Sequence, residues 1–268
     1  LTGTVRPGTE LEVLPLGNRI KVRGIHAYGG KVDEAVAGHS TALSVPDAKE
    51  TGVHRGMVCA DPGVFSKGDA VDVDLTLTPR SPKLTHRVPI RFHTGTVEVR
   101  GQLLLLDRNE AGPRDGFVAR LELDEHVACH PTDRFLLRLQ NPAVTVGGGR
   151  VLRLEDSGRY RRKDLGAELQ GIVDAGDKPE ARVLHELEQA GPIGCAIDDL
   201  SRALSLGDGK VLELVEGVAE VELHEKAMRV FLRDQVVIGE RELLESVDRM
   251  LARRPAAARR AVHAGRQA

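Results

Sequence analysis

Three consecutive glycines, residues 147–149, lie inside a β-rich stretch at residues 133–152. Consecutive glycines are entropically costly, so they usually mark a positive φ angle or a close approach of two backbone segments. Strand-like segments flank them at residues 135–139 and 144–146, and the chain continues as a strand afterwards. Because the segments before this stretch have β patterns and those after it become helical, we interpret the glycines as a structural bend that closes a β-barrel.

A phosphate cradle is the alternative interpretation of the glycine run. A P-loop has the form Gly-x-x-x-x-Gly-Lys-Ser/Thr and leads into a helix. Here Arg150 and Val151 follow the glycines as strand residues, and the P-loop pattern occurs nowhere in the 268 residues. The sequence therefore favours structural closure, and we expect this chain alone neither to bind nor to hydrolyse GTP.

Two β-rich regions fill the first half of the chain. Short apolar segments separated by turn signals occupy residues 1–66, which is typical of a closed barrel or sandwich. Residues 67–155 repeat the pattern, and residues 70–77 alternate between apolar and polar side chains. We interpret Asp72 and Asp74 as a solvated strand face and not as an acid–base pair. The chain begins within a strand pattern and without Met, so we expect it to be a fragment of a longer protein.

Residues 179–254 have a mixed pattern of helix, helix, helix, strand, strand and helix. That order is the winged-helix variant of the helix-turn-helix motif. Pro179 suits the first helical position, and the last helix is predicted at residues 241–253. The third helix, residues 208–216, has two glutamates and one lysine, whereas a helix that enters a nucleic-acid groove should be basic. A spacer or a protein-docking module is therefore the alternative.

A basic cluster at residues 159–163 lies between the β and helical regions. So few basic residues give a short electrostatic footprint, and we favour a solvated linker at residues 156–178 over an RNA-phosphate contact. The tail, residues 255–268, is rich in Ala and Arg and lacks apolar periodicity, so we predict disorder there.

Composition narrows the class of partner. A net charge of −2 argues against general polyanion binding, so any nucleic-acid contact needs a local basic patch. With 3% aromatic residues and no Trp, base-stacking platforms are not expected. The three cysteines form neither a disulfide framework nor a zinc pattern, which suits a reducing cytosol. No apolar run approaches the roughly 18 residues of a membrane helix, so we expect no membrane partner.

The pattern also argues against metal and catalytic centres. His126 and His130 are four residues apart, and in an extended strand they would lie roughly 13 Å apart, which is too far for one ion. No Ser/His/Asp or Cys/His combination has a supporting motif. We therefore predict no metal ligand and no catalytic residue.

The predicted fold is mainly β and then α, and this order resembles the C-terminal part of the selenocysteine-specific translation elongation factors (the SelB family). The Thr-x-Gly-Gly-Gly-Arg-Val run at residues 145–151 is the most specific match. The other matching segments are residues 2–8, 22–25, 37–38, 93–96 and 133–135. The resemblance implies two translation-factor β-barrels, at residues 1–66 and 67–155, a basic linker at 156–178 and a winged-helix domain at 179–254.

The resemblance implies a cytoplasmic, RNA-binding protein of protein biosynthesis. The barrels would bind selenocysteinyl-tRNA for selenocysteine incorporation, with the ribosome as a second partner. An mRNA hairpin would be read by further winged helices, which this chain lacks. The parent family is a GTPase with GTP and Mg²⁺, but no cofactor and no enzyme activity are expected in this chain.

Two groups of site residues follow from the resemblance. The candidate tRNA-phosphate contacts are Arg91, His93, Arg100 and Arg150, chosen as basic residues near the barrel motifs. The family places an Arg after Ala-Gly-x, where it helps to form the selenocysteine pocket, because a cation favours the selenolate anion. Here His39 is followed by Ser40, so the pocket candidates are His39, Ser40 and Arg55.

The alternatives are the arm of another translational GTPase, or a degenerate binding module without catalytic function. A preference for selenocysteinyl-tRNA over seryl-tRNA separates the first interpretation from these.

Overall fold

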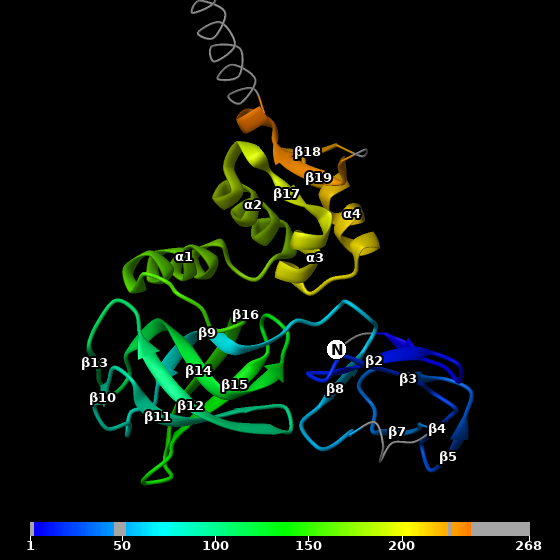
Figure 1. Ribbon diagram of the computed structural model, residues 1–268, viewed down its shortest axis with the longest axis horizontal. Helices are drawn as coiled ribbons and strands as arrows, with labels where there is room; N and C mark the ends of the chain where they lie inside the picture. The colour runs from blue at the N-terminus through cyan, green and yellow to red at the C-terminus, as the bar shows by residue number, and fades with distance from the viewer. Residues whose placement is uncertain (1–2, 46–51, 225–226, 237–268) are drawn as a thin grey trace, which may run out of the picture.

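A computed structural model describes residues 3–45, 52–224 and 227–236. It is mostly β, with small sheets at the N-terminal end, a closed barrel beside them and a helical part above (Figure 1). The helix predicted at residues 241–253 and the tail at 255–268 lie outside the described residues. No helix in the described part of the chain is both long and apolar enough for a membrane crossing.

The first part consists of short strands around one apolar core. Three small sheets have the strand orders β1-β6, β3-β2-β8 and β5-β4-β7. Their inward side chains share a core that includes Val13, Val22 and Ile25. The β character predicted for residues 1–66 is confirmed, and a closed barrel there stays a prediction. The strands are β1 (Thr4–Val5), β2 (Glu10–Leu14), β3 (Asn18–Lys21), β4 (Gly24–Ala27), β5 (Gly30–Val32), β6 (Ala35–Val36), β7 (Thr41–Ser44) and β8 (Val58–Ala60).

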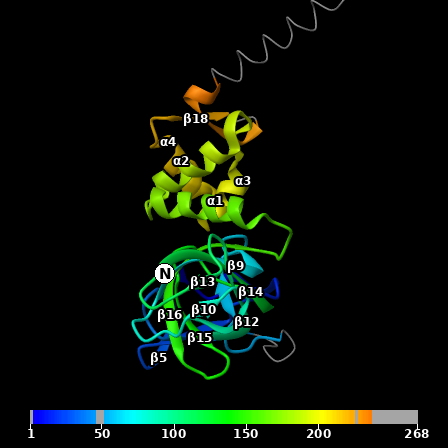
Figure 2. The ribbon, with the colours of Figure 1, turned by 90° about the vertical axis from the view of Figure 1, so that its left-hand side faces the viewer.

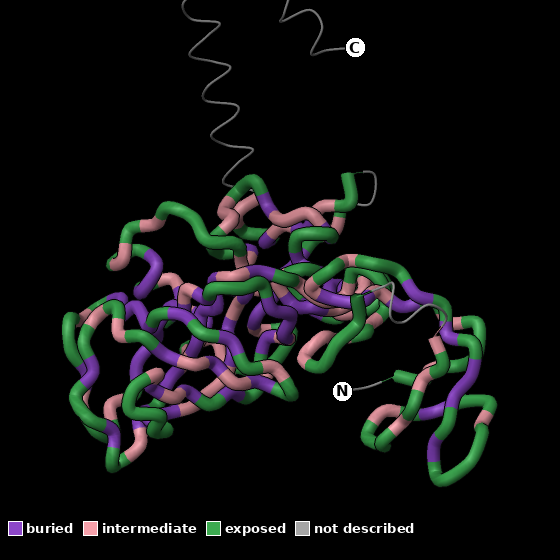
Figure 3. The backbone as a smooth tube through the Cα atoms, turned by 60° about the horizontal axis from the view of Figure 1, so that its bottom comes forward, coloured by how far each residue is buried: buried purple, intermediate pink, exposed green. Residues whose placement is uncertain are grey.

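The second part is a closed six-stranded antiparallel barrel with the order β11-β12-β14-β9-β16-β15. Its interior is mainly aliphatic and includes Phe92, Phe117 and Phe135, and the rings of Phe92 and Phe135 pack against each other. The buried positions concentrate in this barrel and the adjoining helical part (Figure 3). The barrel strands are β9 (Lys67–Leu77), β11 (Val88–Thr94), β12 (Val97–Leu105), β14 (Gly116–Ala128), β15 (Arg134–Leu139) and β16 (Thr145–Glu155), and β10 (Leu84–Thr85) pairs with β13 (Glu110–Ala111) outside it.

The glycine run lies within strand β16 and not at a bend. None of the three glycines has a positive φ angle, so the predicted bend is wrong. Close backbone approach explains them instead, because a Cβ atom at Gly149 would lie 1.8 Å from the carbonyl oxygen of Asp74. The predicted closure is confirmed, since β16 pairs with β15 on one side and β9 on the other.

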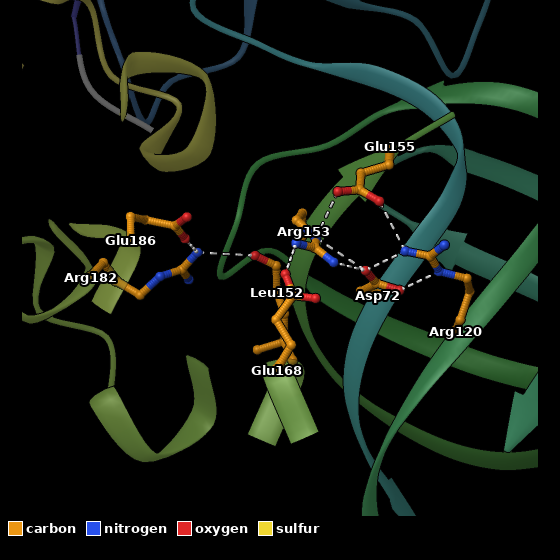
Figure 4. A network of polar contacts seen from close by, with 8 residues as sticks. All are labelled: Asp72, Arg120, Leu152, Arg153, Glu155, Glu168, Arg182 and Glu186. Carbon is orange, nitrogen blue, oxygen red and sulfur yellow. Dashed lines mark hydrogen bonds and ion pairs between the residues drawn. The ribbon is translucent and has the colours of Figure 1, made fainter. Parts of the chain in front are cut away.

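A buried ion network spans three neighbouring strands of the barrel (Figure 4). Asp72 on β9 is fully buried, with its two carboxylate oxygens 2.7 and 2.8 Å from Arg120 on β14. Arg153 on β16 approaches the same carboxylate at 3.2 Å. The solvated-face prediction is therefore wrong for Asp72. Its side chain does point out of the barrel, but Arg120 and Arg153 cover it, and the Tyr160 ring lies over Arg120, with its centroid 4.6 Å from the guanidinium carbon.

In this network, charge pairing affects the pKa of Arg120 more strongly than burial does. Burial alone would lower the pKa of Arg120, but the hydrogen bonds and charges of Asp72 and Glu155 hold that pKa above its ordinary value. Both partners of the central pair are almost inaccessible to solvent. Each charge therefore depends on the other, because an isolated buried charge is strongly unfavourable. Asp74, two residues further on, is only half-buried and pairs with Arg150 at 3.1 Å.

Helix α1 (Arg162–Ala175) packs directly on the barrel. Its Leu165, Leu169 and Ile172 form one buried cluster with Leu106, Val118 and Leu152. At its N-terminus, Arg162 donates hydrogen bonds to the carbonyl oxygens of Leu105 and Arg108. The interpretation of residues 156–178 as a solvated linker is therefore wrong over the helix, which lies across the barrel below the other helices (Figure 2).

The described residues of the helical part include three longer helices, a helical stretch at residues 233–236 and a small sheet with the order β17-β19-β18. The three predicted helices are confirmed, and strand β17 was missed because it has only two residues. Arg182 on α2 (Pro179–Ala190) is 6% exposed, contacts the carbonyl oxygen of Leu152 at 3.5 Å, and thus joins this part to the barrel (Figure 4). The remaining elements are η1 (Gly191–Ile193), β17 (Cys195–Ala196), α3 (Ile197–Leu204), α4 (Asp208–Glu216), β18 (Val221–His224) and β19 (Arg229–Leu232).

The first prediction concerns the glycine strand. Gly149→Ala should lower the free energy of unfolding by about 1–3 kcal/mol, because the new methyl group overpacks against β9. Gly148→Val should also lower the melting temperature, since its Cβ would lie 2.6 Å from the Phe135 carbonyl oxygen. The control is Gly116→Ala on β14, where the nearest atom is 3.9 Å away. Equal thermal melts for Gly149→Ala and Gly116→Ala would contradict the account.

The second prediction concerns the buried ion pair. Asp72→Asn should destabilise the fold by about 3–5 kcal/mol, because it leaves Arg120 buried opposite a neutral amide. Glu10→Gln removes one partner of an exposed pair with Arg19 and should change stability by less than about 1 kcal/mol. Urea unfolding of both variants checks this, and similar midpoints would show that Asp72 is not a central partner.

Candidate nucleic-acid interface

Three arginines form a row across the outer face of strands β12, β11 and β15. Arg91 on β11 lies directly opposite Arg100 on β12 and Arg138 on β15. Neighbours Ile90 and Phe92 are fully buried inside the barrel, so Arg91 must point outward by strand alternation. Two of the predicted tRNA contacts, Arg91 and Arg100, are thus adjacent. We call Arg91, Arg100 and Arg138 the arginine row.

Glu98 and His93 lie next to the arginine row. The carboxylate of Glu98 is 2.6 Å from Arg91 Nη1, and its other oxygen is 3.9 Å from His93 Nδ1. The hydrogen bond from Arg91 is the main reason that the pKa of Glu98 lies below its ordinary value. Glu98 therefore stays ionised at neutral pH, and its carboxylate pairs with Arg91 of the arginine row. The predicted residue His93 is part of this group.

Several side-chain nitrogens in this group have no hydrogen-bond partner among the described residues. They are Arg91 Nε, His93 Nε2 and Arg138 Nε, and all three atoms are inaccessible to solvent. Arg138 does donate from Nη2 to the carbonyl oxygen of Ala143, at 2.8 Å. Buried donors without partners are uncommon, so their concentration beside one another distinguishes this face. Sequence reasoning missed Arg138, because only the strand register places it beside Arg91.

Arg150, the fourth predicted tRNA contact, has a different environment. It lies on β16, opposite Arg134, and its side chain is only 13% exposed. Two carboxylates, Asp74 and Asp177, engage its guanidinium group. Arg150 is therefore compensated within the protein, unlike the arginine row.

The three pocket candidates do not converge. His39 and Ser40 precede β7 in the β5-β4-β7 sheet, and the His39 ring packs edge-on against Tyr28 at 4.8 Å between centroids. Arg55 instead lines a cavity of about 570 Å³ between the first part and the barrel. Glu98, the ion-pair partner of Arg91, lines the same cavity as Arg55, whereas His39 and Ser40 do not line it.

The histidines considered for a metal have separate surroundings. His130 contacts the ring of Phe65 and lies 3.3 Å from the Ser205 carbonyl oxygen. His126 instead lies beside Asp69 and Asp156, with ligand atoms of the three residues within 4.8 Å of one another. This group could not be predicted from the sequence, because its members lie on β9, on β14 and directly after β16.

Asp69 is held in its ionised form. Partial burial acts to raise the pKa of its carboxyl group, but hydrogen bonds from the backbone and side chain of Ser157 and the nearby His126 outweigh this effect. The pKa of Asp69 therefore lies below its ordinary value.

Comparisons with known proteins show which proteins this chain is similar to. Residues 69–157 match the family model described as "Selenocysteine-specific elongation factor, beta-barrel domain". The selenocysteine-specific elongation factor of Desulfomicrobium baculatum is 31% identical over 215 residues, which are 80% of this chain and 33% of that protein. Elongation factor Tu 2 of Streptomyces avermitilis is 30% identical over 160 residues, covering 58% of this chain and 40% of that protein.

The fold agrees with this relationship. The crystal structure of a bacterial selenocysteine-specific elongation factor, EF-Sec, superposes with a TM-score of 0.67 at 18% identity and covers 94% of this chain and 38% of its own. The chain thus spans about a third of the length of its selenocysteine-specific relative from Desulfomicrobium baculatum. The resemblance to the selenocysteine-specific elongation factors is confirmed, and residues 69–157 match the β-barrel domain of that family.

Proposed function

We propose that this chain is the part of a selenocysteine-specific elongation factor that holds aminoacyl-tRNA during selenocysteine incorporation. In this proposal the first part and the barrel act as two tandem translation-factor barrels, and the helical part, residues 179–224 and 227–236, acts as a winged-helix arm. The tRNA is bound by the outer face of the second barrel, at the arginine row. The ribosome is the second partner, and the protein acts in the cytoplasm, where translation takes place.

The arginine row is the observation that carries the proposal. Three arginines lie in register on adjacent strands, and Glu98 pairs with one of them, Arg91, so this face keeps a local positive charge in a chain whose net charge is −2. A guanidinium group has five N–H donors in a planar fork that suits phosphate oxygens. Arg91 and Arg138 each leave an inner nitrogen without a partner, and both keep other donors for a phosphate. A backbone-binding surface of this kind holds RNA without reading its bases.

Aminoacyl discrimination is assigned to the first part of the chain. His39 and Ser40 are exposed beside Tyr28, while Arg55 lies in the cavity next to the barrel. The separation supports different roles. Arg55 would extend the phosphate-binding face, and His39 with Ser40 would be the side chains available near an aminoacyl group.

The helical part is assigned a docking or spacer role. Helix α4 has one basic residue, Lys210, against Asp208, Glu213 and Glu216, so it lacks the charge that a groove-binding helix needs. Reading of an mRNA hairpin is assigned to further winged helices of the full-length factor. Binding of GTP and Mg²⁺ is assigned to a GTPase domain outside this chain, because no P-loop sequence is present in it.

A second candidate is the equivalent arm of a general translation elongation factor. The 30% identity to elongation factor Tu 2 favours it. The two candidates share the same phosphate-binding face and differ in the aminoacyl group that the complete protein prefers.

The third prediction tests the arginine row. The variant Arg91→Ala/Arg100→Ala/Arg138→Ala should weaken binding of a tRNA at least tenfold at low salt, because three phosphate contacts are lost. The slope of log K against log salt concentration should become shallower by about 2. The matched control is Arg19→Ala/Arg23→Ala, which removes two exposed charges from the first part. Fluorescence anisotropy with labelled tRNA measures both, and equal affinities for the two variants would exclude the arginine row as the binding face.

The fourth prediction separates the two candidate functions. With a relative's GTPase domain fused before residue 1, the protein should bind selenocysteinyl-tRNA more tightly than seryl-tRNA on the same tRNA body. A selenolate is anionic at neutral pH whereas serine is neutral, so this preference requires a cation near the aminoacyl group, for which His39 is the candidate. Competition binding measures the ratio, and equal affinities would favour the general elongation factor arm.

A further inference from the structure

Asp69, His126 and Asp156 form a compact group of metal-ligating side chains at one end of the barrel. Each offers one ligand atom, and these atoms lie within 4.8 Å of one another. His126 Nε2 is 3.2 Å from an oxygen of Asp156. Ligand atoms around a single ion bonded at about 2.0–2.2 Å must lie within roughly 4 Å of one another, so small side-chain rotations would bring all three onto one ion.

The backbone register brings these residues together. Strand β9 lies between β14 and β16 in the barrel. Glu155 pairs with Ala70, so the next residues along, Asp156 and Asp69, are neighbours. On the other side, Gly68 pairs with Val127, and the β14 register shifts between Glu122 and Val127. That irregularity places His126 beside Asp69. The grouping therefore follows from strand pairing, and not from the chance extension of long side chains.

The chemistry of the three groups selects a class of ion. One imidazole and two carboxylates give a donor set with a charge of −2, which matches a divalent cation. Imidazole suits Zn²⁺ and other transition metals, whereas Mg²⁺ and Ca²⁺ prefer oxygen ligands alone. The side chains of His126 and Asp156 are 53% and 78% exposed, so water can complete the coordination. With three protein ligands, one position of a tetrahedral Zn²⁺ site is left for water.

The group lies where the chain enters and leaves the barrel, so an ion bound there would connect these two segments. Asp69 lies at the start of β9, where the chain enters the barrel from the first part, and Asp156 directly follows β16, where the chain leaves towards α1. One oxygen of Asp69 already accepts a hydrogen bond from the Ser157 backbone N–H, at 2.5 Å, which ties entry to exit. A bound ion would add direct bonds from both segments and from β14.

We propose that Asp69, His126 and Asp156 bind one divalent transition-metal ion of the Zn²⁺ class, which joins the entry and exit segments of the barrel. The ion is structural and fixes the directions in which the first part and the helical part leave the barrel. The site is separate from the arginine row, which lies on β11, β12 and β15.

Zinc titration tests the site directly. All proteins carry Cys59→Ser, because this exposed thiol is a competing ligand. Competition with a chromophoric chelator should show one bound Zn²⁺ per chain. His126→Gln and Asp156→Asn should each lower the Zn²⁺ affinity at least tenfold, because even changes to residues outside the ligand set commonly alter metal affinity 10- to 100-fold. His26→Gln, an exposed histidine on β4, should bind Zn²⁺ as the parent does. A 100-fold excess of Mg²⁺ should not displace the ion.

Limited proteolysis tests the proposed role of the ion. Zn²⁺ should slow trypsin cleavage after Arg159 and Arg161, which follow Asp156 in the segment before α1, at least threefold in the parent and not in His126→Gln. Circular dichroism without metal should be the same for all variants, because the changed side chains are exposed. Unchanged zinc affinity in both His126→Gln and Asp156→Asn, or an equal loss in His26→Gln, would overturn the proposal.

Discussion

The buried carboxylate of Asp72 organises the barrel and what packs on it. It joins β9 to β14 through Arg120 and to β16 through Arg153. Arg153 also reaches Glu168 on α1 at 2.5 Å, so the same network orients the helix that covers this side. A buried ion pair is weak evidence for net stability, but its partners cannot be separated without a large penalty. The network therefore specifies one arrangement of three strands and a helix.

The outer surface of the barrel has two different halves. Strands β14, β9 and β16 carry the ion network and α1, so their outer face is internal to the protein. The other half of the ring, β15, β11 and β12, presents the arginine row. The glycines of β16 link the two halves, because only a strand without side chains at those positions can approach β9 and β15 so closely. Barrel closure thus sets the register that places Arg138 beside Arg91.

The sequence predicted the features that depend on local pattern. Helices α2, α3 and α4 followed from apolar periodicity and turn residues, and strand alternation correctly placed Asp72 on the outer side of β9. Alternation cannot show what covers an outer face, so the burial of Asp72 by Arg120 and Arg153 was not predictable. The pairing register of strands that are distant in the sequence cannot be predicted from local pattern either. It groups Arg138 with Arg91, and Asp69 with His126 and Asp156, although nothing in their spacing connects them.

The central claim is that the outer face of β11, β12 and β15 is the RNA-binding surface of this chain. Backbone amide chemical shifts, recorded by NMR with and without an unmodified tRNA acceptor-arm hairpin, test it most directly. The account predicts that the largest changes fall on residues 88–94, 97–105 and 134–139, with small changes in the helical part. Changes concentrated in α3 and α4, with the three barrel strands unaffected, would contradict it.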